Sequence, residues 1–216
     1  MQVIDLTHIM ETGMPVFPGS PKASLEKMAH LEADGYDETY LQFSSHTGTH
    51  IDCGRHFYNS GFDTCAASPE KFYGFGLVIN CPGLEPPGLI VKSYLQTYED
   101  KLKRADFILF HTGWNRFWGM ADYFRGFPVL DREAAQYLTD FHLKGTGIDA
   151  ISFDPLESRD FPVHKTLLSS GIVLIENLTN LETLPEEGFI FCCFPLKIKE
   201  GDGSPVRAVG IITKDV

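Results

Sequence analysis

The chain has 216 residues, of which 43% are hydrophobic and 22% are charged, a composition typical of one folded domain with a substantial core. Its net charge of −11 argues against nucleic acid and anionic membrane surfaces as partners, because both bind through clustered Lys and Arg. The opening segment Met1 to Asp5 lacks the basic and apolar regions of a signal peptide, and no apolar run has the length of a membrane span.

The five cysteines are odd in number and include no C-x-x-C pair, so they predict neither a disulfide framework nor a thiolate zinc site. Cys192 and Cys193 are expected to be small buried hydrophobes within a strand. Cys53 is adjacent to Asp52, but its odd position should turn it away from the even-numbered side chains described below, so we expect it to be inert. A reducing cytoplasm suits this cysteine content best.

The first third of the chain combines extended segments with loops. Val3 to Ile9 predicts a first strand, and Thr12 to Pro21, which is rich in Gly and Pro, predicts an extended arm. Tyr40 to Ser45 alternates in character and predicts a strand that leads into a histidine-rich stretch. Ser68 and Pro69 should begin a short helical turn as its N-cap and first helical residue.

From residue 76 onward, strand-like and helix-like segments alternate. The expected strands are 76–80, 105–111, 150–153, 172–178, 189–198 and 206–213. The expected helices are 91–103, 116–123, 131–144 and 162–170, the third beginning at Asp131 and stopped by Gly145 and Gly147. A proline-rich loop is expected at 81–88. The alternation predicts an α/β layered domain over residues 1–216, with no repeat or linker to divide it.

The stretch Ser44 to His56 carries three histidines and an aspartate at even-numbered positions. In an extended segment alternate side chains share a face, so His46, His50 and Asp52 would project together, with Gly48 leaving space between them. A helix would join His46 to His50 but turn Asp52 away, and the stretch is rich in poor helix formers. Imidazole with carboxylate is a ligand set typical of a zinc or manganese hydrolytic centre.

Each of these residues also has an ordinary structural interpretation. A single histidine is commonly a core or surface residue, but three within eleven residues favour a metal site over a structural polar cluster. Glu176 lies in an otherwise apolar run, where a buried carboxylate is costly unless paired or metal-bound, yet it could also lean into solvent at the strand end. His164, in the first turn of an expected helix, is by itself more typical of a surface or capping histidine.

The segment His46 to His56 resembles the H-x-G-T-H-x-D-x-P-x-H signature of the cyclase family of metal-dependent hydrolases, which includes bacterial kynurenine formamidases and isatin hydrolases. One position departs from the signature: Gly54 stands where the family has proline, which should loosen the approach to His56. The resemblance extends over nearly the whole chain. Further segments that look like the family's own are 5–8, 14–19, 111–114, 151–155 and 203–207.

The resemblance implies a single domain of the swivelling β/β/α type with a mixed sheet, and it implies a metal centre. His46, His50 and Asp52 would hold one divalent ion, with zinc expected first and manganese as the alternative. Asp52 and Glu176 would bridge to a second ion that His164 also holds, although some relatives work with one ion. His164 and Glu176 have the twelve-residue separation of the further ligands in kynurenine formamidases.

By the same resemblance, His56 would be the proton donor and acceptor, a role suited to an unligated histidine with a pKa near 6.5. A bound divalent ion lowers the pKa of its water from ~15.7 to roughly 7. Since there is no G-x-S-x-G or other nucleophile signal, metal-bound hydroxide is the expected attacker. Phe17 and Trp114 are expected to line the pocket and stack on an aromatic substrate. The other aromatic residues of that region are more typical of core or interface: Phe117, Trp118 and Tyr123.

The expected activity is hydrolysis of a small aryl formamide or cyclic amide, with N-formylkynurenine as the first substrate. Two alternatives stay open: a hydrolase or cyclase acting on another lactone, lactam or ester, and a metal-containing protein that binds a small molecule without turnover. The resemblance also implies a homodimer or homotetramer, in which the N-terminal arm could reach a neighbouring pocket. The remaining histidines are expected to be structural: His8, His30, His111 and His142.

Overall fold

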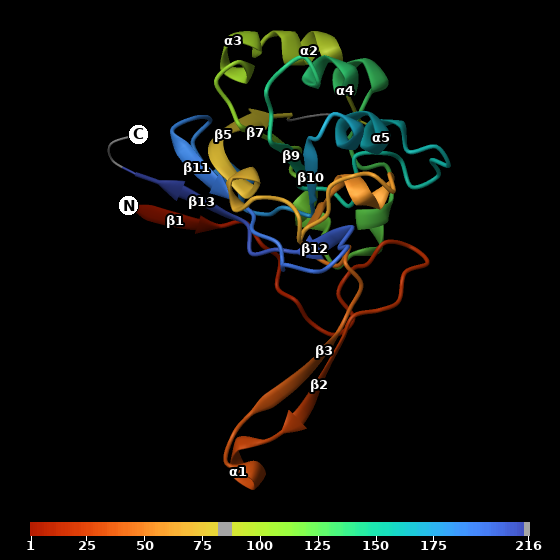
Figure 1. Ribbon diagram of the computed structural model, residues 1–216, viewed down its shortest axis with the longest axis vertical. Helices are drawn as coiled ribbons and strands as arrows, with labels where there is room; N and C mark the ends of the chain where they lie inside the picture. The colour runs from red at the N-terminus through yellow and green to blue at the C-terminus, as the bar shows by residue number, and fades with distance from the viewer. Residues whose placement is uncertain (82–87, 214–216) are drawn as a thin grey trace.

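The computed structural model describes residues 1–81 and 88–213, and within them the dominant element is a nine-stranded mixed sheet (Figure 1). Its strands, in spatial order, are β1 (Gln2–Asp5), β13 (Val209–Ile212), β11 (Phe189–Cys192), β5 (Tyr73–Asn80), β7 (Phe107–His111), β9 (Gly145–Ile148), β10 (Val173–Glu176), β4 (His50–Asp52) and β12 (Gly203–Pro205). The central strands β5, β7, β9 and β10 are parallel. The strands that flank them on both sides pair antiparallel. The first and last strands of the chain are neighbours, since β1 pairs with β13.

Helices cover one face of the parallel strands (Figure 1). They are α2 (Lys92–Gln96), α3 (Glu99–Leu102), α4 (Arg132–Leu138) and α5 (Pro162–Ser169). Because successive side chains in a strand point to opposite faces, Leu77 and Ile79 pack into the helix-side core and Val78 packs into a core on the other side. The curled sheet itself encloses that second core, with Ile51 and Phe189 from its antiparallel flanks. The predicted α/β layered fold with a mixed sheet is confirmed.

The central strand β9 corrects one prediction. Gly145 and Gly147 do not stop a helix, because α4 ends at Leu138 and both glycines lie in β9. A Cβ at Gly145 would come within 2.6 Å of Val173 Cγ2, and one at Gly147 within 2.5 Å of Leu178 Cδ1. Large side chains from neighbouring strands therefore fill the space beside the β9 backbone, which favours glycine. The strand expected at 150–153 therefore lies earlier in the chain, as β9, and residues 150–153 form a loop after it.

Most other predicted elements exist with shorter bounds. The helix expected at 91–103 is divided into α2 and α3, and the one at 116–123 is two 3₁₀ turns at Trp114–Phe117 and Ala121–Phe124. The turn begun by Ser68 and Pro69 is a 3₁₀ turn, Pro69–Phe72. Residues 82–87 of the expected proline-rich loop lie outside the described residues. Four strands were not predicted: β12, β6 (Leu89–Ile90), β8 (Val129–Leu130) and β2 (Ser24–Ala29).

A two-stranded hairpin projects far from the body of the molecule (Figure 1). It consists of β2 (Ser24–Ala29) and β3 (Glu38–Gln42), with the one-turn helix α1 (Leu31–Asp34) at its tip. The expected strand at 40–45 therefore begins earlier and ends at Gln42. All of β3 is exposed, and the exposed apolar side chains of the hairpin are Met28, Leu31, Tyr36, Tyr40 and Leu41.

The longest helix in the described part of the chain is α5, which has eight residues. Among the described residues no helix combines the length and the apolar character needed to cross a bilayer.

The close packing around β9 generates a prediction for stability. Gly147→Ala should lower the free energy of unfolding by about 1–3 kcal/mol, because its methyl group would overlap with Leu178 and Leu109. Urea unfolding would measure this change. Ser169→Ala, at an exposed position at the end of α5, is the control and should change the value little. Equal stabilities for the two variants would contradict the packing assigned to Gly147.

Candidate metal centre

The histidine-rich stretch supplies its side chains from a turn and a strand. His50 and Asp52 lie in β4 and share a face as predicted, whereas His46 lies in the turn before it. Gly48 adopts φ +65°, a left-handed conformation that favours glycine, and the turn directs His46 Nδ1 to within 2.6 Å of Asp52 Oδ1. The prediction that one strand presents all three residues is therefore wrong for His46. Gly48 bends the chain rather than leaving space on a strand face.

His164 and Glu176 meet Asp52 from separate elements. Glu176 ends β10, which pairs antiparallel with β4 so that Glu176 lies opposite His50, and His164 lies in the first turn of α5. His164 is only 4% exposed and Glu176 only 5%, so the surface interpretations of both residues are wrong. His164 Nε2 is 3.1 Å from Glu176 Oε1 and 3.6 Å from Asp52 Oδ2. His50 Nε2 is 3.3 Å from Asp52 Oδ1 and 3.5 Å from Glu176 Oε2.

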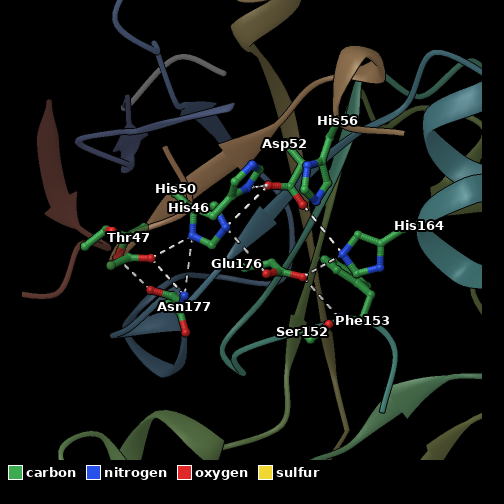
Figure 2. Close-up of polar contacts among 12 residues, drawn as sticks. His46, Thr47, His50, Asp52, His56, Ser152, Phe153, His164, Glu176 and Asn177 are labelled. Atoms are coloured by element: carbon green, nitrogen blue, oxygen red, sulfur yellow. Dashed lines mark hydrogen bonds and ion pairs between the residues drawn. The ribbon is translucent and has the colours of Figure 1, made fainter. Parts of the chain in front are cut away.

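One ring nitrogen of each of His46, His50 and His164 faces Asp52 or Glu176 (Figure 2), and the other, outer nitrogen of each ring has a hydrogen-bond acceptor. His50 Nδ1 donates to the Gly48 carbonyl at 2.8 Å. His164 Nδ1 donates to Asp154 Oδ2 at 2.7 Å, and His46 Nε2 donates to Asp202 Oδ2 at 2.9 Å. The other nitrogen of every ring is thereby directed at Asp52 or Glu176. Acceptors of this kind orient histidine ligands in metal sites, so the residues present fit a divalent cation.

Two sets of three possible ligand atoms lie within 4.8 Å of one another in the described part of the chain. One set is His46, Asp52 and His56, and the other is His50, Asp52 and Glu176. Asp52 belongs to both sets, whereas His164 belongs to neither. The sets separate His46 from His50, which the resemblance places on the same ion. The assignment of individual ligands to ions therefore stays a prediction.

Two of the histidines are held protonated by the carboxylates around them when no metal is bound. Burial by itself would lower the pKa of His46, but the charge of Asp52 and hydrogen bonds to Asp202 and Asp52 raise it to about 10. Burial likewise opposes protonation of His164, whose pKa the contacts with Asp154, Glu176 and Asp52 raise to about 10. The pKa of Asp52 is lowered despite its complete burial, because His46 and His50 face it. Without a bound metal, protons on His46 and His164 would thus offset part of the carboxylate charge.

His56 differs from the ligand histidines because partial desolvation lowers its pKa below the ordinary value of 6.5, although its side chain stays 30% exposed. It is neutral at pH 7 and can accept a proton. His56 lies in the 3₁₀ turn Gly54–His56, where its N–H donates to the Cys53 carbonyl and the N–H of Tyr58 donates to the Gly54 carbonyl. These hydrogen bonds define the approach to His56 with glycine in the place of the signature proline. The neighbouring Cys53 thiol is buried, and burial raises its pKa to about 12, so it stays protonated.

The cluster lies at the floor of a pocket of about 290 Å³. Phe17 lines this pocket, as predicted, together with two aromatic residues that were not predicted from the sequence, Phe57 and Phe161. Trp114 is not among the lining residues. It is 5% exposed and packs in the helix-side core, where its Nε1 donates to the Tyr123 carbonyl at 2.9 Å. The expected pocket role of Trp114 is therefore wrong, because its polar atom already has a partner inside the core.

A buried amide connects this core to the histidine turn. Tyr123 Oη donates to Asn177 Oδ1 at 2.7 Å, and Asn177 Nδ2 donates to the Gly48 carbonyl at 2.8 Å. The same carbonyl accepts from His50, so Asn177 helps to hold the acceptor that orients a ligand histidine. Three residues around the histidines were not predicted from the sequence: Asp154, Asn177 and Asp202. Only Asp154 had a signal, since it falls in the family-like segment 151–155.

Comparisons with known proteins agree with this geometry. A family model described as “Putative cyclase” matches residues 4–155. A kynurenine formamidase from Geobacillus thermodenitrificans is 31% identical over 207 residues, covering 95% of each chain. An uncharacterized protein from Methanocaldococcus jannaschii is also 31% identical, over 98% of this chain and 100% of its own.

Solved structures with the same fold include several that exceed a quarter sequence identity. Isatin hydrolase A from Labrenzia aggregata, bound to benzyl benzoate, has a TM-score of 0.89 and 26% identity, covering 99% of this chain and 94% of that one. A structure described as a potential metal-dependent hydrolase with cyclase activity has a TM-score of 0.81 and 27% identity, covering 99% and 98%.

The protons on the histidines generate a pH prediction. Because the pKa of His46 in the folded metal-free protein exceeds the unfolded value of 6.5, its contribution to stability is complete below pH 6.5 and is lost as the pH rises through about 10. The stability difference between the wild type and His46→Gln, both free of metal, should therefore shrink from pH 7 to pH 10. Urea unfolding across this range would measure it.

The exposed His142 provides a control, since His142→Gln should show no such trend. Zinc affinity of the wild type should rise over the same pH range, because the ion competes with protons for the ring nitrogens. A stability difference that stays constant or grows with pH would contradict the proposed charge balance.

Proposed function

The chain belongs to the cyclase family of metal-dependent hydrolases, and we propose that it hydrolyses the C–N bond of a small aryl formamide or cyclic aryl amide. The observation that carries the proposal is the pair of buried carboxylates, Asp52 and Glu176, which face three histidines at the floor of an aromatic-walled pocket. N-formylkynurenine is the substrate to test first, because several relatives carry the name kynurenine formamidase.

The residues that would hold the metal are those with ring nitrogens or carboxylate oxygens directed into the cluster. They are His46, His50, Asp52, His164 and Glu176. Nitrogen and carboxylate donors suit zinc first and manganese second, as one or two ions. When bound there, a divalent ion would lower the pKa of a water molecule and polarise the carbonyl of the substrate.

His56 would move the proton that hydrolysis requires. It lines the pocket, and its ring lies 4.0 Å from that of His46, measured between centroids. Because its lowered pKa keeps it neutral at pH 7, it can accept a proton from the attacking water and return it to the leaving nitrogen. This transfer converts a poor amide leaving group into a neutral amine.

The aromatic walls would orient the aryl group of the substrate. Phe57 and Phe161 lie 5.6 Å apart between ring centroids, and Phe17 lines the pocket from the N-terminal arm. Offset or edge-to-face contacts with such rings position a planar ligand and exclude water around it. The formamide or ring amide would then lie toward the carboxylates and histidines of the floor.

The role of His56 gives a direct test of the function. His56→Gln should reduce kcat for N-formylkynurenine by about 10²–10⁴-fold while leaving the bound metal in place, because it removes the general acid–base group. Steady-state kinetics and metal analysis of the same sample would measure both. His142→Gln, at an exposed position, should keep wild-type kinetics. Unchanged turnover in His56→Gln would exclude the assigned role, and inactivity of the wild type on a panel of aryl amides would exclude the function.

We also propose that the chain forms a homodimer or homotetramer through the projecting hairpin. A two-stranded hairpin is at best marginally stable alone in water, and the exposed side chains of Met28, Tyr40 and Leu41 would be buried if a second copy covered it. An exposed apolar ribbon of this kind is typical of an oligomer interface.

Light scattering of the wild type should give about two or four times the chain mass of 24.2 kDa. Charged substitutions at the hairpin, Tyr40→Lys with Leu41→Lys, should shift it to the monomer by making burial of the ribbon unfavourable. A wild-type monomer would refute the proposal.

A further inference from the structure

Asp202 lies where the edge strand β12 meets the histidine-rich stretch. β12 pairs antiparallel with β4, with Gly203 opposite Asp52, and the Asp202 carbonyl accepts the N–H of Cys53 at 2.8 Å. The pairing therefore places Asp202 beside the point at which the chain leaves β4 for the turn that carries His56.

The carboxylate of Asp202 contacts two histidines through the same oxygen. Oδ2 is 2.9 Å from His46 Nε2 and 3.6 Å from His56 Nδ1. The rings of His46 and His56 lie next to each other, tilted by 36°. One carboxylate therefore lies beside both rings. In the proposed function these rings have different roles, since His46 would hold the metal and His56 would exchange a proton with the substrate.

The backbone around Asp202 is built to hold it in place. A Cβ at Gly203 would come within 2.6 Å of the Ile51 carbonyl and 2.7 Å of His46 Cε1, so a side chain there would displace His46. On the other side, the Gly201 carbonyl accepts the N–H of Thr64 at 3.0 Å, and Thr64 Oγ1 donates to the Ile198 carbonyl. Contacts on both sides of Asp202 thus fix the backbone that carries it.

We propose that Asp202 is a positioning residue that orients His46 and His56 together. By accepting the proton of His46 Nε2 it leaves His46 Nδ1, 2.6 Å from Asp52 Oδ1, free for the cation. At 3.6 Å, beyond hydrogen-bond distance, its negative charge favours the proton on His56 Nδ1, which leaves His56 Nε2 as the nitrogen that exchanges a proton with the substrate. The first half concerns the metal site alone. The second half rests on the proposed function, because it uses the role assigned to His56.

Two variants separate the hydrogen bond from the charge. Asp202→Ala removes the acceptor and should weaken zinc binding by about 10–100-fold, the usual effect of losing a group that orients a metal ligand. Asp202→Asn keeps an acceptor oxygen and should lose less affinity. Zinc affinity would be measured by competition with a chromogenic chelator, and the histidine tautomers of the zinc-loaded protein by ¹⁵N NMR.

The wild type should show His46 protonated at Nε2 and His56 protonated at Nδ1, and Asp202→Ala should lose both preferences. A falling kcat with an unchanged KM would accompany this loss. The matched control is Glu200→Ala, since Glu200 is an acidic residue of the same loop that pairs with Arg55 at 3.6 Å on the surface. It should change neither zinc affinity nor the tautomers.

Zinc affinity within about threefold of the wild type in Asp202→Ala, with both tautomers retained, would overturn the proposal. Loss of the His46 preference alone would also overturn it, since one carboxylate would then not orient both rings. Should Asp202→Ala fail to fold by circular dichroism, Asp202→Leu, which also lacks an acceptor, carries the same comparison. A wild type inactive on every aryl amide would defeat the proposed function, while affinity and tautomers would still decide the role of Asp202.

Discussion

The burial of two carboxylates, Asp52 and Glu176, is the constraint on which the site depends. Their strands pair side by side, and neither residue is more than 5% exposed, so their charge must be balanced from within the protein. His46 and His164 provide this balance as imidazolium groups when no metal is bound, and a divalent cation can replace their protons. Charge balance thus explains why histidines from three separate elements converge on one point.

The fold brings these elements together at one end of the parallel strands. β10 delivers Glu176, α5 delivers His164 and the antiparallel neighbour β4 delivers Asp52, while the edge strand β12 adds Asp202 from the far end of the chain. The close approach of neighbouring side chains to the glycines of β9 keeps the centre of the sheet compact beneath this site. Hydrogen-bond acceptors on the outer nitrogens of His46, His50 and His164 then orient the inner nitrogens of these rings toward the two carboxylates.

Spacing in the sequence predicted the metal-site character of His46, His50 and Asp52, because imidazole and carboxylate groups clustered this closely are typical of metal ligands. The same spacing predicted the wrong local geometry for His46, since the left-handed turn at Gly48 depends on a backbone conformation that alternation does not reveal. Glu176 and His164 were ambiguous alone and needed the family resemblance, because burial is a property of the packed fold. Asp202 had no signal at all: an aspartate in a polar loop becomes significant only when β12 pairs with β4.

The central claim is that the carboxylate and histidine cluster holds a divalent ion that the hydrolysis requires. The most direct measurement is N-formylkynurenine turnover by protein stripped with a strong chelator, followed as zinc is returned in sub-stoichiometric steps. We predict no turnover without metal and a linear recovery that ends at one or two ions per chain. Full turnover by the stripped protein, with metal absent by elemental analysis, would contradict the claim.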